Sequence, residues 1–140
     1  MKISELINIT NAEVLGSFDE DFDVEISTDT RTVKKGDFYL PLKGASFDGE
    51  NFINQAFEKG AIGSFCTREH PLRGLLLKVP DALIAYLQLA NYLRNKNNYK
   101  VVAITGSSGK TTTKEMLYSV FATQYKTHKT YLKSLLYVIV

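Results

Sequence analysis

The residues best suited to chemistry in this 140-residue chain form a short glycine loop in its C-terminal part. The loop has the pattern G-x-x-G-K-T and continues into a run of threonines. Glycines let main-chain N–H groups approach phosphate oxygens closely, and a lysine placed here reaches the terminal phosphates of a nucleotide. The hydroxyl of the next threonine is suited to hold Mg²⁺. The candidate phosphate-binding residues are Gly106, Ser107, Ser108, Gly109, Lys110, Thr111 and Thr112, with Lys110 and Thr111 as candidate catalytic residues and Thr111 as the candidate metal ligand.

The elements expected on either side of the loop are those that a phosphate site requires. Val101–Thr105 is a β-branched apolar run that predicts a strand, and Lys114–Ala122 predicts a helix. A helix N-terminus adds partial positive charge to such a site. The spacing departs from the usual G-x-x-x-x-G-K-[ST], so two interpretations stay open. The flanking elements favour a shortened phosphate loop over a glycine turn that only joins a strand to a helix.

A second polar cluster lies far upstream. Its residues are Ser27-Thr28-Asp29-Thr30-Arg31, and the segment Lys43-Gly44-Ala45-Ser46-Phe47 follows it along the chain. Hydroxyls and a guanidinium suit the edge of a uracil ring and a diphosphate. By itself, however, the same cluster is also typical of a turn or a strand end, and the residues alone favour that interpretation.

Both segments resemble the Mur ligases, which are ATP-dependent enzymes of peptidoglycan precursor synthesis. Thr105–Met116 resembles their ATP loop, and Ser27–Arg31 together with Lys35–Gly44 and Phe47–Phe52 resembles their uridine-nucleotide domain. The form Ser-Ser-Gly-Lys-Thr-Thr-Thr-Lys-Glu is most similar to the members that add D-alanyl-D-alanine to UDP-N-acetylmuramoyl-tripeptide. Two motifs in the family's order carry more weight than either one alone.

The resemblance implies an amide ligase that uses ATP and Mg²⁺, with UDP-N-acetylmuramoyl-tripeptide and D-alanyl-D-alanine as small-molecule substrates. ATP would phosphorylate a substrate carboxylate to an acyl phosphate, and an amine would attack it to give an amide. No role is implied for Glu50, because many relatives carry histidine there. The resemblance places seven residues near the UDP-linked substrate: Thr28, Thr30, Arg31, Lys43, Ala45, Ser46 and Phe47.

The expected fold class is α/β. We predict a small mixed α/β UDP-substrate domain at residues 1–80, a connecting helix and linker at 81–99, and the first strand, loop and helix of an incomplete parallel-sheet ATPase domain at 100–140. Gly60 is expected to end a helix in the left-handed conformation. Periodicity and turn residues predict helices at Ser4–Asn8, Glu50–Lys59 and Leu83–Arg94, and strands at Val24–Thr28, Phe38–Leu42, Ala61–Cys66 and Leu75–Val79.

Composition and charge exclude several classes of protein. With 44% hydrophobic and 23% charged residues, the chain is neither collagen-like, disordered nor a disulfide scaffold. Residues 100–140 carry six lysines and one acid, and we interpret this positive charge as suited to phosphate ligands. The segment shows no aromatic stacking platform of the kind that binds nucleic acid, so nucleic-acid binding is disfavoured. The single cysteine, Cys66, is expected to be buried, and His70 is expected to lie in a surface turn without partners.

The two ends of the chain carry the remaining expectations. The N-terminal segment has an acid at Glu5 and no uninterrupted apolar stretch, so we expect no signal peptide, no membrane span and a cytoplasmic protein. Residues 131–140 depart from the asparagine-rich stretch of the family. A frameshift or early stop is the leading explanation, and a native strand or docking segment is the alternative.

Three functions remain open on this basis. The first is a ligase of which these residues are a fragment that is inactive alone, and the second is a non-catalytic UDP-sugar-binding module. The third is a small P-loop kinase or GTPase, which the shortened loop and the lack of downstream acids disfavour. After Thr111 the chain has a single carboxylate side chain, Glu115.

Overall fold

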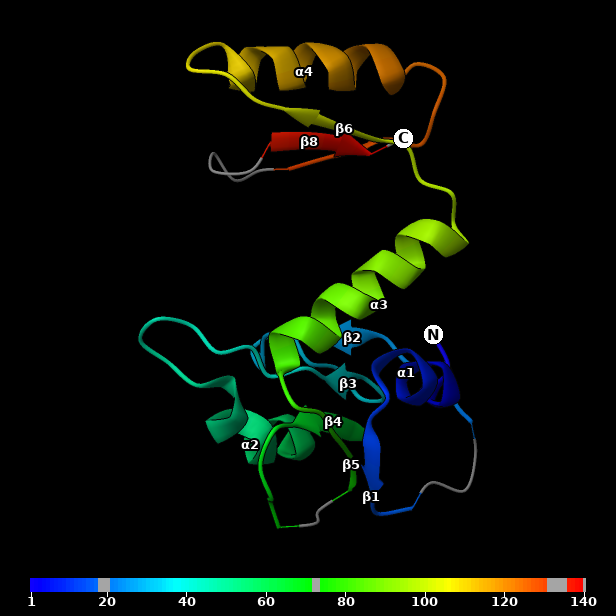
Figure 1. Ribbon diagram of the computed structural model, residues 1–140, viewed down its shortest axis with the longest axis vertical. Coiled ribbons are helices and arrows are strands. Elements are labelled where there is room, and N and C mark those ends of the chain that lie inside the picture. Colours follow the sequence, from blue (N-terminus) through cyan, green and yellow to red (C-terminus); the bar gives the residue numbers. More distant parts are fainter. Residues whose placement is uncertain (18–20, 72–73, 131–135, 140) are drawn as a thin grey trace. The chain divides into compact units, whose positions relative to one another are not determined.

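The computed structural model describes residues 1–17, 21–71, 74–130 and 136–139 (Figure 1). The chain divides into two compact units, Met1–Leu93 and Arg94–Val140. Each unit is built on a sheet of its own. Helix α3, Ala82–Lys96, crosses the limit between the units.

A five-stranded mixed sheet with the order β1-β5-β4-β3-β2 forms the centre of the first unit. Strands β2 to β5 run parallel, and β1 pairs antiparallel with β5. Parallel strands end at one edge of the sheet, so the loops that follow them are brought together there. The strands are β1 (Glu13–Leu15), β2 (Ile26–Ser27), β3 (Phe38–Tyr39), β4 (Gly63–Cys66) and β5 (Leu75–Lys78).

The side chains of this sheet alternate between two faces, and helices cover both faces. Phe38 and Phe65 pack edge to face in one layer, with ring centroids 5.3 Å apart. The face toward α1 (Ile3–Thr10) and α3 carries the larger buried cluster, which includes Ile3, Leu6, Phe38, Leu40, Phe65, Leu75, Leu77, Ala85 and Leu89. The face toward α2 (Ile53–Glu58) carries Val33, Tyr39, Ile53, Ala56, Ala61, Cys66 and Leu76.

Local signals explain how the helices of this unit begin and end. The helix predicted at Glu50–Lys59 is a 3₁₀ turn, η1 (Gly49–Phe52), that continues into α2. The Asp48 carboxylate accepts a hydrogen bond from the Glu50 N–H and caps η1, which accounts for the early start. Gly60 has φ 98°, so the predicted left-handed residue after α2 is confirmed.

Cys66 lies at the end of β4 with none of its surface exposed, as the sequence predicts. Burial raises the pKa of its thiol to about 11. Because the thiolate is the nucleophile, a thiol in this environment is inert in the folded unit. The cysteine therefore has a packing role in the cluster against α2.

The second unit has a three-stranded sheet with the order β6-β8-β7 and one helix. Both pairings are antiparallel, so within the described residues β6, the strand expected to begin an incomplete parallel sheet, has no parallel neighbour. The reason is that β6 pairs with a strand from the C-terminal end of the chain itself. The elements are β6 (Val101–Ile104), α4 (Lys110–Phe121), β7 (His128–Lys129) and β8 (Leu136–Ile139).

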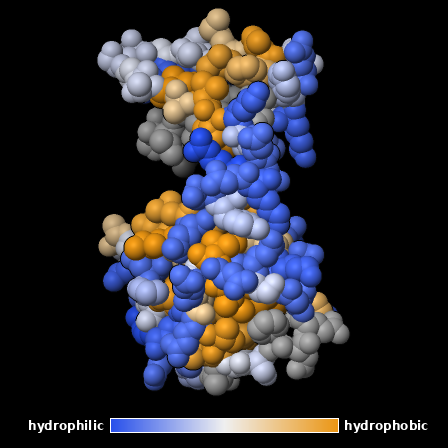
Figure 2. Space-filling model, turned by 45° about the vertical axis from the view of Figure 1, so that its right-hand side comes forward, coloured by the Kyte–Doolittle hydropathy of each residue, from blue (hydrophilic) through white to orange (hydrophobic). Residues whose placement is uncertain are grey.

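Apolar side chains also reach the surface, where hydrophobic patches interrupt the polar surface of both units (Figure 2). Leu83, Ile84 and Leu87 of α3 are each more than half exposed. Within the part of the chain that the structure describes, no helix has the length and apolar character needed to cross a membrane.

Candidate functional site

The glycine loop joins β6 directly to α4, as the sequence predicts. Gly106 has φ 146° and Gly109 has φ 74°, and both values lie in the region that favours glycine. The turn at Gly109 lets α4 begin at Lys110, one turn earlier than expected. A Cβ at Gly109 would meet no atom outside its chain neighbours within 4 Å, so the space beside this residue is open.

Lys110 lies across this loop. Its ammonium donates a hydrogen bond to the Gly106 carbonyl, while Thr111 and Thr112 are exposed in the first turn of α4. The loop N–H groups, the helix N-terminus and the ammonium together can bind a polyphosphate. Among the described residues no group of three or more His, Cys, Asp or Glu side chains is suited to hold a metal ion. The Thr111 hydroxyl fits Mg²⁺ as one oxygen ligand beside phosphates and water.

Two of the lysines of the second unit are engaged in contacts within that unit and are not available to bind phosphate. For these two, our interpretation of the positive charge of residues 100–140 as suited to phosphate ligands does not apply. Lys114 is 4% exposed, and its ammonium donates to the Thr130 carbonyl at 2.7 Å. Lys129 pairs with Glu115 and lies 4.3 Å from the centre of the Tyr118 ring. The hydrogen bond from Lys129 is the main cause that lowers the pKa of Glu115. These contacts tie α4 to β7.

In the first unit, several residues that the resemblance implicates surround one pocket of about 490 Å³, here called the Thr30 pocket. Thr28, Thr30, Arg31 and Phe47 line it. The remaining lining residues are Asp29, Tyr39, Leu42, Phe52 and Gln55. Sequence reasoning did not implicate Phe52 or Gln55, because they reach the pocket only through the packing of η1 and α2.

Hydrogen bonds fix the polar side of the Thr30 pocket. The Thr30 hydroxyl donates to Gln55 Oε1 at 2.8 Å, and Lys59 Nζ donates to the Thr30 carbonyl at 2.7 Å. The Arg31 guanidinium donates hydrogen bonds from Nε and Nη2 to the Asp29 carboxylate, and Nη2 lies 2.6 Å from Oδ2. This contact is the main cause that lowers the pKa of Asp29 to about 2. The pocket thus combines hydroxyl, amide and guanidinium groups with an exposed aromatic ring, that of Phe47.

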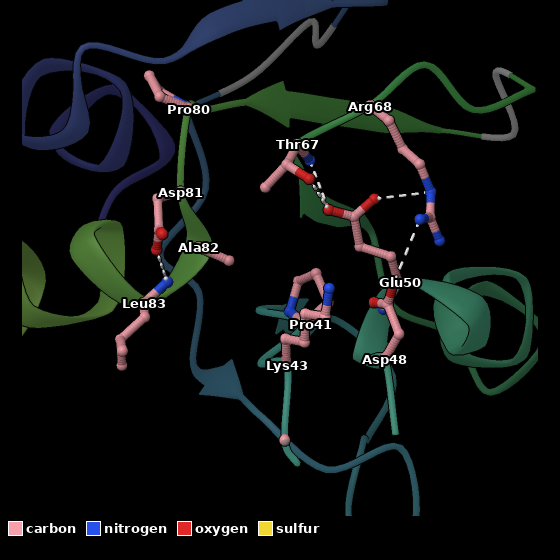
Figure 3. A pocket seen from close by; sticks show the side chains of 11 residues that line it. Pro41, Lys43, Asp48, Glu50, Thr67, Arg68, Pro80, Asp81, Ala82 and Leu83 are labelled. Atoms are coloured by element: carbon pink, nitrogen blue, oxygen red, sulfur yellow. Dashed lines mark hydrogen bonds and ion pairs between the residues drawn. The ribbon is translucent and has the colours of Figure 1, made fainter. Parts of the chain in front are cut away.

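The other three predicted substrate residues do not line the Thr30 pocket. Ala45 and Ser46 are exposed and line neither of the pockets described in this unit. Lys43 faces a second pocket of about 440 Å³, here called the Lys43 pocket (Figure 3). Besides Lys43, this pocket is lined by Pro41, Gly44, Asp48, Glu50, Thr67, Arg68, Pro80, Asp81, Ala82 and Leu83.

A buried carboxylate organises one wall of the Lys43 pocket. Glu50 is 5% exposed, and its Oε1 accepts from the N–H and the hydroxyl of Thr67. Its Oε2 contacts His70 Nε2 at 2.9 Å and Arg68 Nε at 3.3 Å. Burial favours the neutral acid, but the hydrogen bonds from His70 and Thr67 and the charge of Arg68 outweigh it and lower the pKa of Glu50.

The prediction that His70 has no partner is therefore wrong. Its side chain is 17% exposed and contacts a carboxylate twenty residues away in the sequence. Glu50 lies in η1 and His70 follows β4, so no local pattern in the sequence reports their contact. Glu50, to which the sequence assigned no role, is the centre of this cluster.

Comparison with known proteins adds to this geometry. The profile of the Mur ligase family, catalytic domain, matches residues 24–106, and that of the Mur ligase middle domain matches residues 104–135. The UDP-N-acetylmuramoyl-tripeptide–D-alanyl-D-alanine ligase of Bacillus subtilis is 41% identical over 108 residues, which are 75% of this chain and 24% of the relative.

Solved structures give the same result. The structure of UDP-N-acetylmuramoylalanyl-D-glutamyl-2,6-diaminopimelate–D-alanyl-D-alanyl ligase from Acinetobacter baumannii is similar with a TM-score of 0.76 and 36% identity, over 86% of this chain and 28% of that chain. A MurF ligase from Thermotoga maritima in complex with ADP is similar with a TM-score of 0.60 and 28% identity, over 71% and 23% of the two chains. The chain spans about a quarter of the length of these relatives.

Proposed function

The chain belongs to the Mur ligase family, and from this premise we propose that it forms part of an ATP-dependent ligase that adds D-alanyl-D-alanine to UDP-N-acetylmuramoyl-tripeptide. The observation that carries the proposal is the presence of two different sites in one chain, in the order of the family. One is the polar Thr30 pocket, and the other is the glycine loop at the start of α4.

We assign the Thr30 pocket to the uridine end of the UDP-linked substrate. The Thr28 hydroxyl and the Arg31 guanidinium supply polar contacts, and the ring of Phe47 supplies a stacking surface for the base. Thr30 already donates to Gln55, so its role is to orient that amide. Ala45 and Ser46 line neither pocket, and the family resemblance alone assigns them, in the loop ahead of Phe47, to the border of the same ligand.

We assign the glycine loop to the phosphates of ATP. The main-chain N–H groups from Gly106 to Thr112 bind the phosphate oxygens, and the Lys110 ammonium exchanges the Gly106 carbonyl for a terminal phosphate. Thr111 would hold Mg²⁺ through its hydroxyl. Bound ATP would transfer its terminal phosphoryl group to the substrate carboxylate, which would give an acyl phosphate and ADP, and Mg²⁺ would offset the charge of the phosphates. Attack by the amine of D-alanyl-D-alanine on the acyl phosphate would then form the amide and release inorganic phosphate.

The domain assignment follows from these two sites. Residues 1–80 bind the UDP-linked substrate, 81–99 connect, and 100–140 begin the ATPase domain. The two compact units meet between Leu93 and Arg94, within the segment assigned as the connection, and the first part of that segment packs in the core of the first unit. We expect no turnover by these 140 residues alone. There are two reasons for this expectation. Lys114 is the one buried residue among residues 94–130, so this part of the chain has no apolar core, and the Glu115 carboxylate is already paired with Lys114 and Lys129. A ligase that consumes ATP and a UDP-linked precursor works in the cytoplasm.

Calorimetric titration of the 140-residue chain tests both assignments. Phe47→Ala should weaken the binding of UDP-N-acetylmuramoyl-tripeptide by about fivefold or more, because stacking on a base contributes about 1–3 kcal/mol. Phe22→Ala removes another half-exposed ring and should leave this affinity unchanged. Lys110→Ala should weaken ADP binding by at least about tenfold. Lys126→Ala, at an exposed lysine outside the loop, is its matched control.

A second candidate function, a non-catalytic UDP-sugar-binding module, is favoured by one observation. Both pairings of the second sheet are antiparallel, unlike the parallel sheet of an ATPase domain. The two candidates differ in the ADP titration. Binding of ADP that depends on Lys110 supports the ligase, whereas binding of the UDP-linked substrate with no ADP binding supports the module.

A further inference from the structure

Strand β6 lies at one edge of the second sheet, and its outer side pairs with no strand among the residues that the structure describes. On its inner side it pairs with β8, from Val101 opposite Ile139 to Ile104 opposite Leu136. All four residues of β6 are apolar. The outer side of such a strand presents N–H and C=O groups that can pair with a strand of another chain.

The other edge strands differ from β6 in length and charge. Among the strands that the structure describes they are β1, β2 and β7. β1 has three residues and begins with Glu13, and β2 has two residues and directly follows Glu25. β7 consists of His128 and Lys129. Short edge strands with charged side chains resist pairing with another chain, so β6 has the edge best suited to it.

Helix α4, which covers one face of this sheet, exposes apolar side chains on the β6 side (Figure 1). Lys129 of β7 contacts Glu115 and Tyr118, so these two residues mark the flank of α4 that faces β7. β6 and β7 lie at opposite edges of the sheet. With about 3.6 residues per turn, Met116 and Val120 fall on the flank away from β7, above β6. Each is about two-thirds exposed.

A pocket of about 250 Å³ lies between the strand and this flank of the helix. Val102 of β6 and Phe121 of α4 line it, and Tyr125, which is more than half exposed, extends its aromatic wall. Asn98 and Lys100 complete the lining. The outer side of β6, this pocket and the side chains of Met116 and Val120 form one mainly apolar surface, here called the β6 surface.

The second unit needs the burial that a partner on this surface would give. Among residues 94–130 no apolar side chain is buried. A unit of this size has too little interior to be stable without a further contribution, and oligomerisation is one of the usual sources. Covering the β6 surface buries apolar side chains from both the strand and the helix.

We propose that the β6 surface binds a second copy of the same chain, with the two β6 strands antiparallel about a two-fold axis perpendicular to the sheet. This axis keeps both α4 helices on one face of the joined sheet, so the flank of one helix faces the flank of the other. An extended peptide would pair with the strand but leave Met116 and Val120 uncovered, whereas a second copy covers both. The inference goes beyond the proposed function and does not rest on it, because it uses neither ligand site.

The charges around β6 agree with this arrangement. Lys100 precedes the strand, and antiparallel pairing places it beside the opposite end of β6 in the other copy. That end carries Ile104 and Thr105, which are neutral, so the two lysines do not face each other. Glu115 and Lys129 lie on the β7 side of the unit and stay outside the interface.

Sedimentation velocity of the 140-residue chain at about 10–500 µM tests the proposal. The chain should pass from monomer to dimer with no larger species, because a two-fold contact closes on itself. Val120→Lys should raise the dissociation constant of the dimer about tenfold or more, since it places a charge in the apolar interface. Ser119→Lys adds the same charge at the next residue, which is exposed and lies on the flank of Glu115, and should leave the constant unchanged.

Two further measurements test the fold of the variants and the role of the strand. Val120 and Ser119 are both exposed, so the variants should melt at the same temperature as the unsubstituted chain at the lowest concentration. Amide hydrogen exchange at residues 101–104 should be slower at the highest concentration than at the lowest, because pairing protects the outer N–H groups. Ala103→Lys, at an exposed position of the edge strand, should weaken the dimer as Val120→Lys does.

Four results would overturn the proposal. A chain that stays monomeric at every concentration has no such interface, and assemblies that grow beyond the dimer are incompatible with a two-fold contact. A dimer that Val120→Lys leaves intact does not use the flank of α4. A dimer in which exchange at residues 101–104 is independent of concentration does not use the edge of β6.

Discussion

At the scale of single residues, Glu50 connects parts of the chain that are distant in sequence. Its carboxylate lies in η1, and its partners Thr67, Arg68 and His70 follow β4. A buried carboxylate with four contacts contributes to stability as long as it is ionised. Removal of the Glu50 carboxylate leaves the Thr67 N–H and the His70 ring without this acceptor. This lowers the free energy of unfolding even where the backbone is unchanged.

This arrangement predicts a specific dependence of stability on pH. The pKa of Glu50 is lowered in the folded chain, so its contribution is complete above its ordinary value of 4.5 and is lost as the pH falls through the lower folded value. Glu50→Gln should therefore lower the free energy of unfolding at pH 7 by about 1–2 kcal/mol. The difference from the unsubstituted chain should shrink below pH 4.5. Urea unfolding across pH 3–7 measures it.

Glu58→Gln is the matched control for this experiment. Glu58 is an exposed residue of α2, so its substitution should leave the pH dependence of unfolding unchanged. An equal pH dependence in the unsubstituted chain and the Glu50 variant would contradict the role given to the buried carboxylate.

At the scale of elements, the hairpin Lys43–Asp48, whose end residues form an antiparallel bridge, depends on a glycine. A Cβ added at Gly44 would lie 2.4 Å from Cε1 of Phe47, so the ring must move. Gly44→Ala should therefore weaken uridine binding through Phe47. Calorimetry on a double-mutant cycle checks this: Gly44→Ala should have no further effect in the Phe47→Ala background. Additive losses would show that the glycine acts by another route.

The loop before α4 supports a second prediction at this scale. Gly109 and Gly36 both have positive φ, and a Cβ at either would meet nothing within 4 Å. Alanine at each position should thus cost a similar amount of stability, about 1 kcal/mol, from backbone strain. Only Gly109→Ala should weaken ADP binding, because it changes the N–H groups that bind phosphate. Equal ADP affinity in both variants, measured by calorimetry, would refute this role for the loop.

Elements with strong local signals were predictable, and those that depend on packing were not. Helix α3 and the β6–loop–α4 segment have periodic apolar residues or glycines at fixed positions, and the structure shows both elements. Strand β1 has three residues, none of them buried, and forms because β5 presents a free edge. The structure gathers four of the seven predicted substrate residues in the Thr30 pocket. The contact of Glu50 with His70, in contrast, joins two residues twenty positions apart, and no local signal in the sequence indicates it.

At the scale of the whole molecule, the division into two units predicts that the two ligands act locally. Amide hydrogen exchange followed by NMR measures this. UDP should slow exchange around residues 28–47, and ADP should slow exchange around residues 106–113, because each ligand orders the N–H groups that it contacts. Protection by UDP confined to residues 106–113 would contradict the assignment of the sites.

The buried thiol gives the first unit an internal reporter. Cys66 is the single cysteine of the chain, it has no exposed surface, and burial raises its pKa to about 11. A maleimide can label it only in molecules whose sheet has opened away from α2. The labelling rate therefore measures the opening of Met1–Leu93 without any engineered probe, and a ligand that binds this unit will slow that rate in proportion to its occupancy.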